Sequence, residues 1–211
     1  MSSIRIFASL GIAGAFLMFI GDMCLYGHFG SSRDFMTNLS IVISKEPDAR
    51  IITGGFIAPV ASFLYCLGFF SIYKMVSPKS PILAIIFIVS SVVMMLFGGA
   101  YHAMWGIRGL LIKAGLPSSN YQGLYNKIVK YTRLFYNTMS VLAGVAALIL
   151  LFVVLSGRSL YPRWTAVVNP GLLLLFKPLT RFIPSPLGAI ISGGYLNLVF
   201  IIFFSVIVIL I

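Results

Sequence analysis

Six stretches of mainly apolar residues constrain the fold of this chain most strongly, because about 20 such residues make a helix long enough to cross a bilayer. They cover residues 6–27, 52–75, 81–104, 134–156, 164–180 and 187–211. Inside hydrocarbon, backbone N–H and C=O groups must pair within the protein, which favours helices. The sequence therefore predicts an all-α, polytopic integral membrane bundle of about six transmembrane helices, with residues 1–211 as a single transmembrane domain.

Two of the six stretches need comment. The fifth is interrupted by Asn169-Pro170-Gly171 and closed by Lys177-Pro178, so it predicts a short or broken helix. The first resembles a signal peptide, but it is long, contains Asp22 and has no clear small-residue cleavage site. We expect it to be the first span.

The charged residues fit the membrane interpretation. They make up 9% of the chain, against roughly a quarter in soluble domains. The net charge of +11 arises from Lys and Arg near the ends of apolar stretches, where basic residues signal membrane topology. We therefore expect membrane lipids as partners and no nucleic acid. The sequence leaves the oligomeric state open.

Topology follows from how the 15 basic residues divide between the two faces. Six spans place ten on the face of loops 28–51, 105–133 and 181–186, with Lys177 at the border: Arg33, Lys45, Arg50, Arg108, Lys113, Lys127, Lys130, Arg133, Arg181 and Lys177. Five belong to the other face: Arg5, Lys74, Lys79, Arg158 and Arg163. The excess of basic residues on the first face predicts that this face is cytoplasmic. Both termini are then predicted to lie on the non-cytoplasmic face. Against this, loop 28–51 holds three acids and a glycosylation triplet, Asn38-Leu39-Ser40.

The two longer loops are expected to contain helices. One is predicted from a cap near Ser31 through about Ser44, and another from Pro117 into the fourth span. The second includes Lys127, Lys130 and Arg133 among aromatic residues. Such a stretch is typical of an interfacial anchor that touches anionic lipid, and the alternative is a lid over a pocket.

Asp22 is the only acidic residue within a span. It lies about five residues, or on the order of 7 Å, inside the end of the first span. An acid at that depth is costly and usually faces the bundle interior or water, so it is a candidate functional residue. The structural alternative is a hydrogen bond to a Tyr or Asn on a neighbouring helix.

Polar and small residues recur on one helix face in several spans. In the third span, Ser91, Gly98, His102 and Trp105 follow three- and four-residue spacing. Helix packing in lipid uses such stripes too. However, most of these residues lie in the half of the membrane next to loops 28–51 and 105–133, whereas the other half is almost entirely apolar. This asymmetry predicts a cavity open to one face and sealed at the other.

The predicted site combines an acid–base pair with binding residues. Asp22 and His102 are the candidate catalytic pair, because a histidine titrates near neutrality and can exchange a proton with a carboxyl group. The candidate ligand-binding residues are aromatic, basic or amide side chains: Tyr26, Tyr101, Trp105, Arg108, Arg133, Asn137 and Asn197. Either arginine could neutralise Asp22, bind an anionic head group or simply contact lipid phosphate.

Several chemistries are disfavoured. The two cysteines, Cys24 and Cys66, differ in predicted depth by roughly 16 Å, too far for a disulfide, and there is no Cys-x-x-Cys motif. Asp22 and the two histidines, His28 and His102, barely supply the ligands that a metal hydrolase needs. We therefore expect no cofactor and no metal site.

Three functions remain. The chain binds or modifies a hydrophobic or lipid-like small molecule, or it is a proton-coupled small-solute transporter that uses Asp22, or it is a non-catalytic membrane assembly partner. The first is favoured because the polar groups are one-sided, whereas a transporter usually places its site near the midplane and opens to both faces. The sequence does not decide whether the protein is an enzyme.

Overall fold

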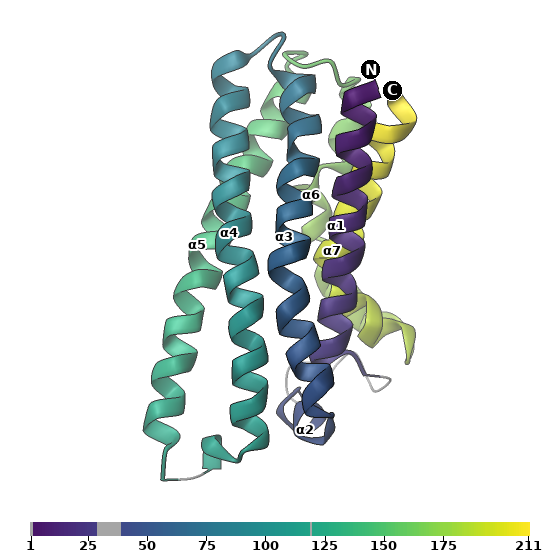
Figure 1. The fold of residues 1–211 in the computed structure, drawn as a ribbon. Helices are drawn as coiled ribbons and strands as arrows, with labels where there is room; N and C mark the ends of the chain where they lie inside the picture. The colour runs from purple at the N-terminus through teal and green to yellow at the C-terminus, as the bar shows by residue number, and fades with distance from the viewer. Residues whose placement is uncertain (1, 29–38, 119) are drawn as a thin grey trace.

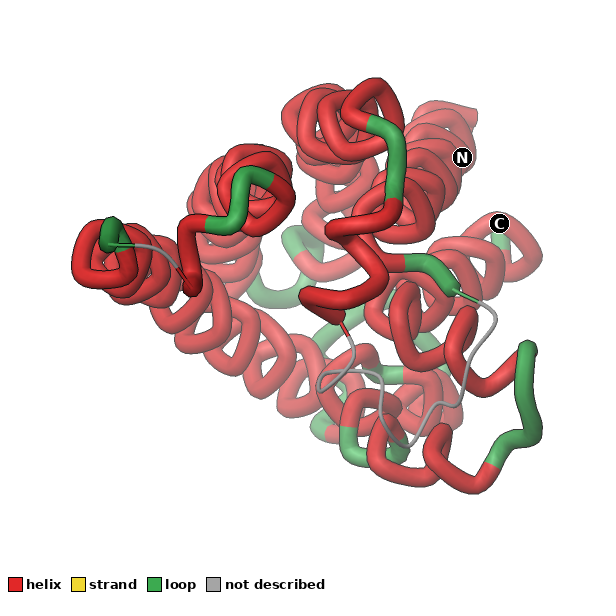
Figure 2. The backbone as a smooth tube through the Cα atoms, turned by 90° about the horizontal axis from the view of Figure 1, so that it is seen from below, coloured by secondary structure: helices red, strands yellow, loops and turns green. Residues whose placement is uncertain are grey.

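A computed structural model describes residues 2–28, 39–118 and 120–211, and this part of the chain contains helices and loops but no strand (Figure 2). Five of its helices are long and apolar enough to span a membrane: α1 (Ser2–Tyr26), α3 (Asp48–Val76), α4 (Pro81–Lys113), α5 (Gln122–Leu155) and α7 (Leu187–Leu210). The predicted all-α bundle is confirmed, and these five helices fit an integral multi-pass membrane protein.

The fifth predicted stretch forms three short helices instead of one spanning helix: η2 (Arg163–Val168), α6 (Pro170–Leu174) and η3 (Lys177–Phe182). Asn169 ends the first and caps the second, accepting a hydrogen bond of 2.9 Å from the Gly171 backbone N–H. Pro178 lacks a backbone donor to continue the run. The described chain thus has five long helices, and the short ones connect the end of α5 to the start of α7. Both termini consequently lie at the same end of the bundle (Figure 1).

Glycine pairs set the spacing between neighbouring long helices. A Cβ on Gly68 of α3 would lie 2.5 Å from the Cα of Gly11 on α1, and one on Gly55 would lie 3.2 Å from the Cα of Gly106 on α4. Backbones this close require residues without side chains. Gly55 therefore serves close packing, since it lies between two helix backbones.

The loop helices differ in part from the prediction. Helix α2 (Leu39–Lys45) covers the end of the first expected helix, whose predicted start near Ser31 lies outside the described residues. The second expected helix begins at Gln122 instead of Pro117, because Leu116–Ser118 form a separate turn of 3-10 helix, η1. From Gln122, α5 continues unbroken to Leu155, as predicted.

Two polar contacts hold the end of the bundle that carries α2. The Arg50 guanidinium at the start of α3 donates hydrogen bonds of 2.8 and 2.6 Å to the carbonyl oxygens of Met23 and Gly27 at the end of α1. The Met23 carbonyl also accepts a hydrogen bond of 3.1 Å from the Gly27 backbone N–H, and a cation beside carbonyls at a helix C-terminus is favourable. Lys113, at the end of α4, forms an ion pair with Asp48. The ends of α1, α3 and α4 are thereby fixed close to one another.

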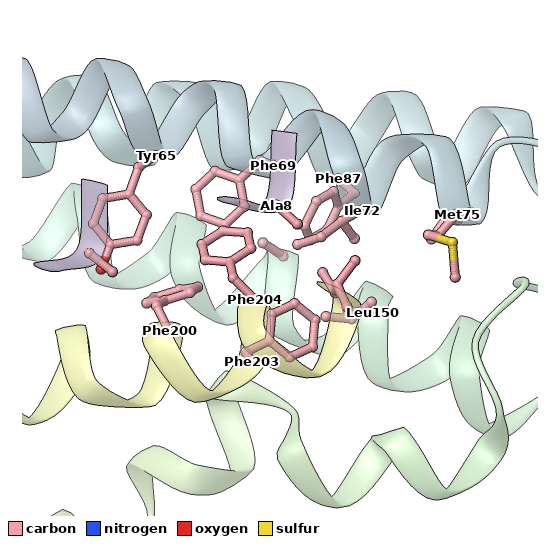
Figure 3. Close-up of a cluster of buried hydrophobic side chains, with 14 of the residues drawn as sticks. Ala8, Tyr65, Phe69, Ile72, Met75, Phe87, Leu150, Phe200, Phe203 and Phe204 are labelled. Atoms are coloured by element: carbon pink, nitrogen blue, oxygen red, sulfur yellow. The ribbon is translucent and has the colours of Figure 1, made fainter. Parts of the chain in front are cut away.

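An aromatic cluster fills the space between α3 and α7 (Figure 3). Phe200 meets Tyr65 edge to face at 5.3 Å between ring centroids and Phe69 at 5.7 Å, and Phe204 packs against both of those α3 rings. Edge-to-face rings at these distances attract beyond the area that they bury. Ala8 of α1, Phe87 of α4 and Leu150 of α5 border this cluster, so it joins all five long helices.

Candidate functional site

A cavity of about 620 Å³ lies between the helices, with walls from α1, α3, α4, α5, α6 and α7 and single residues from α2 and η3. Along α4 its lining extends from Phe87 to Trp105, which are 18 positions apart, or about 27 Å along a helix. Polar side chains gather near the Trp105 end, whereas Phe69, Ile72 and Leu150 line the other end. The cavity is therefore long and amphipathic, and its volume is in the range of about 300–1,000 Å³ typical of small-molecule sites.

Asp22 is the centre of the polar end. Its side chain is buried, and its two oxygens accept hydrogen bonds from Tyr26 on Oδ1 and from Asn197 Nδ2 on Oδ2, the latter at 2.6 Å. Asn197 in turn accepts a hydrogen bond of 2.6 Å from the Tyr65 hydroxyl. This chain of contacts links α1, α7 and α3. It supplies the partners that a carboxyl group away from water requires.

His102 of α4 completes the group around the acid. Its Nε2 lies 3.4 Å from Asp22 Oδ1, an ion pair when the imidazole is protonated. The rings of Tyr26 and Tyr101 lie 6.5 and 6.0 Å from the imidazole, centroid to centroid. The other ring nitrogen, Nδ1, is buried and has no hydrogen-bond partner in the described part of the chain. The arrangement permits proton exchange between the imidazole and the carboxyl group.

Six of the nine predicted site residues line this cavity: Asp22, Tyr26, Tyr101, His102, Trp105 and Asn197. The other three, Arg108, Arg133 and Asn137, are not among its lining residues. The Arg108 guanidinium lies 3.9 Å above the Trp105 ring, where it supports that side chain by a cation–π contact. Arg133 and Asn137 are exposed on α5. Within the described residues, neither arginine forms an ion pair with Asp22.

Two contributors to the polar end were absent from the prediction. Tyr65 is hidden in sequence by the apolar residues around it, although a hydroxyl in such a stretch needs a partner and is a signal in itself. Lys177 was predicted to close the fifth stretch at the border of the loop face, yet it lines the cavity from η3. The sequence signal for Lys177 was that this charge follows an interrupted apolar stretch and therefore does not mark the end of a complete span.

The cavity also extends beyond the polar residues on which its prediction rested. The observed cavity continues to Ile72, Phe87 and Leu150, deep among apolar residues. Small side chains explain the extra space on α5, where Ala143, Gly144, Ala146 and Ala147 line it. The glycines and alanines of the bundle therefore leave space for the cavity at some positions and permit close helix packing at others.

The cavity wall along α5 includes three exposed residues, Tyr136, Ser140 and Gly144. At Gly144 no atom lies within 4 Å of where a Cβ would be. Further along, α5 is covered again, because the Asn169 side chain donates a hydrogen bond of 3.1 Å to the Ala147 carbonyl. We interpret this exposed part of the wall as an opening to the side of the bundle and call it the side opening.

Disulfide chemistry and metal binding have no site in the ranges that the structure describes. Cys24 and Cys66 are both free thiols. No three His, Cys, Asp or Glu side chains come together there as metal ligands would.

Comparisons with known proteins were made for the whole chain. No curated protein and no solved structure gives a significant match. A family model does match, over residues 1–211, and its description is "Family of unknown function (DUF6796)". Because the match covers the full sequence, the chain belongs to this family.

Proposed function

We propose that this protein binds one lipid-like amphipathic molecule within the membrane. The head group would lie at the polar end beside Asp22, His102 and Asn197, and the chain would extend toward Phe87 and Leu150. The observation that carries the proposal is the one-sided distribution of polar atoms along a single cavity of about 620 Å³. A ligand with one polar end and one apolar end matches that distribution, because polar groups away from water need partners and apolar groups do not.

The side opening supports a ligand that arrives from the bilayer. Gly144 lies 10 positions beyond Leu134, where the apolar part of α5 begins, or about 15 Å along the helix. That depth is near the middle of a hydrocarbon core of about 30 Å. A molecule entering beside Gly144 therefore comes from among lipid chains.

The geometry favours binding over transport or turnover. The apolar end of the cavity is bounded by the aromatic cluster of α3 and α7, so its polar groups do not continue toward the termini. Both Asp22 oxygens are engaged by protein donors, and His102 Nδ1 is covered by protein. Asp22 and His102 thus act in this proposal as groups that position and solvate the head group.

Tryptophan fluorescence offers a direct test, because the chain has only two tryptophans. Trp105 lines the cavity and is buried, whereas Trp164 of η2 is 55% exposed and is not part of the lining. In a Trp164→Phe variant all tryptophan emission comes from Trp105. A dibrominated stearoyl monoglyceride, added in detergent, should quench that emission saturably, and unbrominated monoolein should restore it by competition.

The matched control is Trp105→Phe, which leaves Trp164 as the reporter. Quenching of Trp164 should rise in proportion to the brominated lipid in the micelle and should not respond to competition by small amounts of monoolein. If Trp105 behaves in the same non-saturable way, no ligand occupies the cavity and the proposal fails.

A further inference from the structure

Lys177 is held at the depth of the membrane-spanning part of α7. On one side of it in sequence, the Leu173 carbonyl accepts a hydrogen bond of 2.7 Å from Tyr195. On the other side, the Thr180 hydroxyl accepts one of 2.6 Å from Ser192. These two contacts hold the segments on either side of Lys177 against the second and third turns of α7. Those turns lie about 8–12 Å along the helix from its first residue, Leu187.

A charged side chain at such depth is costly and normally faces a polar partner or a cavity. Lys177 is an exposed residue that lines the cavity, and its ammonium group has no hydrogen-bond or ion-pair partner among the described residues. It is near enough to Asp22 to interact electrostatically, though the two do not form an ion pair. In the described part of the chain it is the only Lys or Arg on the cavity wall.

At the polar end, therefore, the acceptor oxygens of Asp22 have hydrogen-bond partners, whereas the donor hydrogens of Lys177 have none among the described residues. The acid, Asp22, accepts hydrogen bonds from Tyr26 and Asn197 and faces His102. The ammonium group of Lys177 has three donors and no acceptor. A ligand head group that completes this end must supply acceptor atoms, and a negative charge would best complement Lys177.

We infer that the head group of the ligand is anionic, a carboxylate or a phosphate monoester on a single hydrocarbon chain, and that Lys177 binds it. This inference rests on the proposed function and adds the chemical class of the ligand. A single chain fits because a cavity of about 620 Å³ is of the size that holds one small molecule.

The test uses three competitors that share an oleoyl chain and differ in the head: oleate, oleoyl lysophosphatidate and monoolein. Each displaces the brominated monoglyceride from Trp105 in the full-length Trp164→Phe protein. The anionic competitors should act at concentrations roughly tenfold lower than monoolein, as expected for one charge-assisted contact. Comparison of oleate with lysophosphatidate tells whether a carboxylate or a phosphate is preferred.

Three variants locate the effect. Lys177→Gln should abolish the preference for anionic over neutral competitors while monoolein still binds, and Lys177→Arg should retain it. Lys130→Gln removes an exposed charge of α5 away from the cavity and controls for general attraction of anions to a basic protein.

The inference is overturned if all three competitors are equivalent, if a cationic oleyl amine is the best of the series, or if Lys130→Gln has the same effect as Lys177→Gln. In each of those cases the neutral lipid still binds, so the proposed function stands. If neither the brominated lipid nor any competitor binds at Trp105, the proposed function itself fails.

Discussion

Asn197 of α7 donates a hydrogen bond of 2.6 Å to the carboxylate of Asp22 on α1, across 175 positions of sequence. The same amide accepts a hydrogen bond from Tyr65 of α3. The intramembrane acid is therefore both part of the cavity wall and a connection between three helices. Its candidate functional role and its structural alternative coexist in one arrangement.

Replacing Asn197 by Leu should destabilise the protein, because Asp22 Oδ2 and the Tyr65 hydroxyl would each lose their partner. An unsatisfied buried polar group costs about 1–3 kcal/mol, and interhelical hydrogen bonds in membranes average somewhat less. We expect a loss of about 1–3 kcal/mol, measured by thermal unfolding in detergent. Tyr65→Phe removes only the outer hydrogen bond and should cost about 1 kcal/mol. Equal stability of Asn197→Leu and wild type would show that this network contributes nothing to the fold.

The fold was predictable because its signals are local. Apolar length located the five long helices, and Asn169-Pro170-Gly171 predicted the broken segment through capping and proline chemistry. The exact start of α5 was not predictable, because residues near Pro117 fit both a helix start and a 3-10 turn. Helix boundaries depend on such small local differences.

The candidate site was predictable in its members but not in its pairings. Asp22, His102 and Asn197 stood out as polar residues within apolar spans, and the structure brings them together. Depth does not determine rotation about the helix axis, which is why Arg133 and Asn137 face outward on α5. Lys177 reaches the cavity only because the fifth stretch breaks, and periodicity does not predict the path of irregular chain.

Blocking the side opening should prevent ligand entry without harming the fold. Gly144→Leu adds a side chain where no atom lies within 4 Å, at the surface of the cavity. Saturable quenching of Trp105 by the brominated monoglyceride should be lost or slowed at least tenfold. Gly123→Leu is the matched control, since Gly123 also lies on α5 with open space around it but is not part of the cavity lining. Unchanged binding kinetics in Gly144→Leu would show that the ligand enters elsewhere.

The contact between α1 and α3 should be intolerant of even one methyl group. In Gly68→Ala the new Cβ would lie 2.5 Å from the backbone of Gly11, so the two helices must separate. Overpacking of this kind typically costs about 1–3 kcal/mol. Gly123→Ala has the opposite sign, because alanine favours helix over glycine by about 1 kcal/mol and meets no neighbour there. Unfolding midpoints in a denaturing detergent titration compare the two, and a stabilised Gly68→Ala would contradict the close helix contact.

The orientation of the protein remains a prediction that the structure makes easier to test. Both termini lie at one end of the bundle, so one reporter position reveals both (Figure 1). Since Lys177 belongs to the cavity, nine basic residues remain on the loop face against five on the face of the termini. Two of the nine, Arg50 and Lys113, pair with Glu46 and Asp48. Acids contribute little to orientation, so the excess still predicts that the termini lie outside the cytoplasm.

In a bacterial host, a C-terminal alkaline phosphatase fusion should be active and a C-terminal green fluorescent protein fusion dark. Replacing Lys127, Lys130 and Arg133 by Ser should reduce the bias, because six basic residues would then face five, and a mixed population should give signal from both reporters. Replacing Lys74 and Lys79 instead leaves nine against three and should sharpen the original result. A fluorescent fusion with an inactive phosphatase in the unaltered protein would reverse the assignment and place the polar end of the cavity on the non-cytoplasmic side.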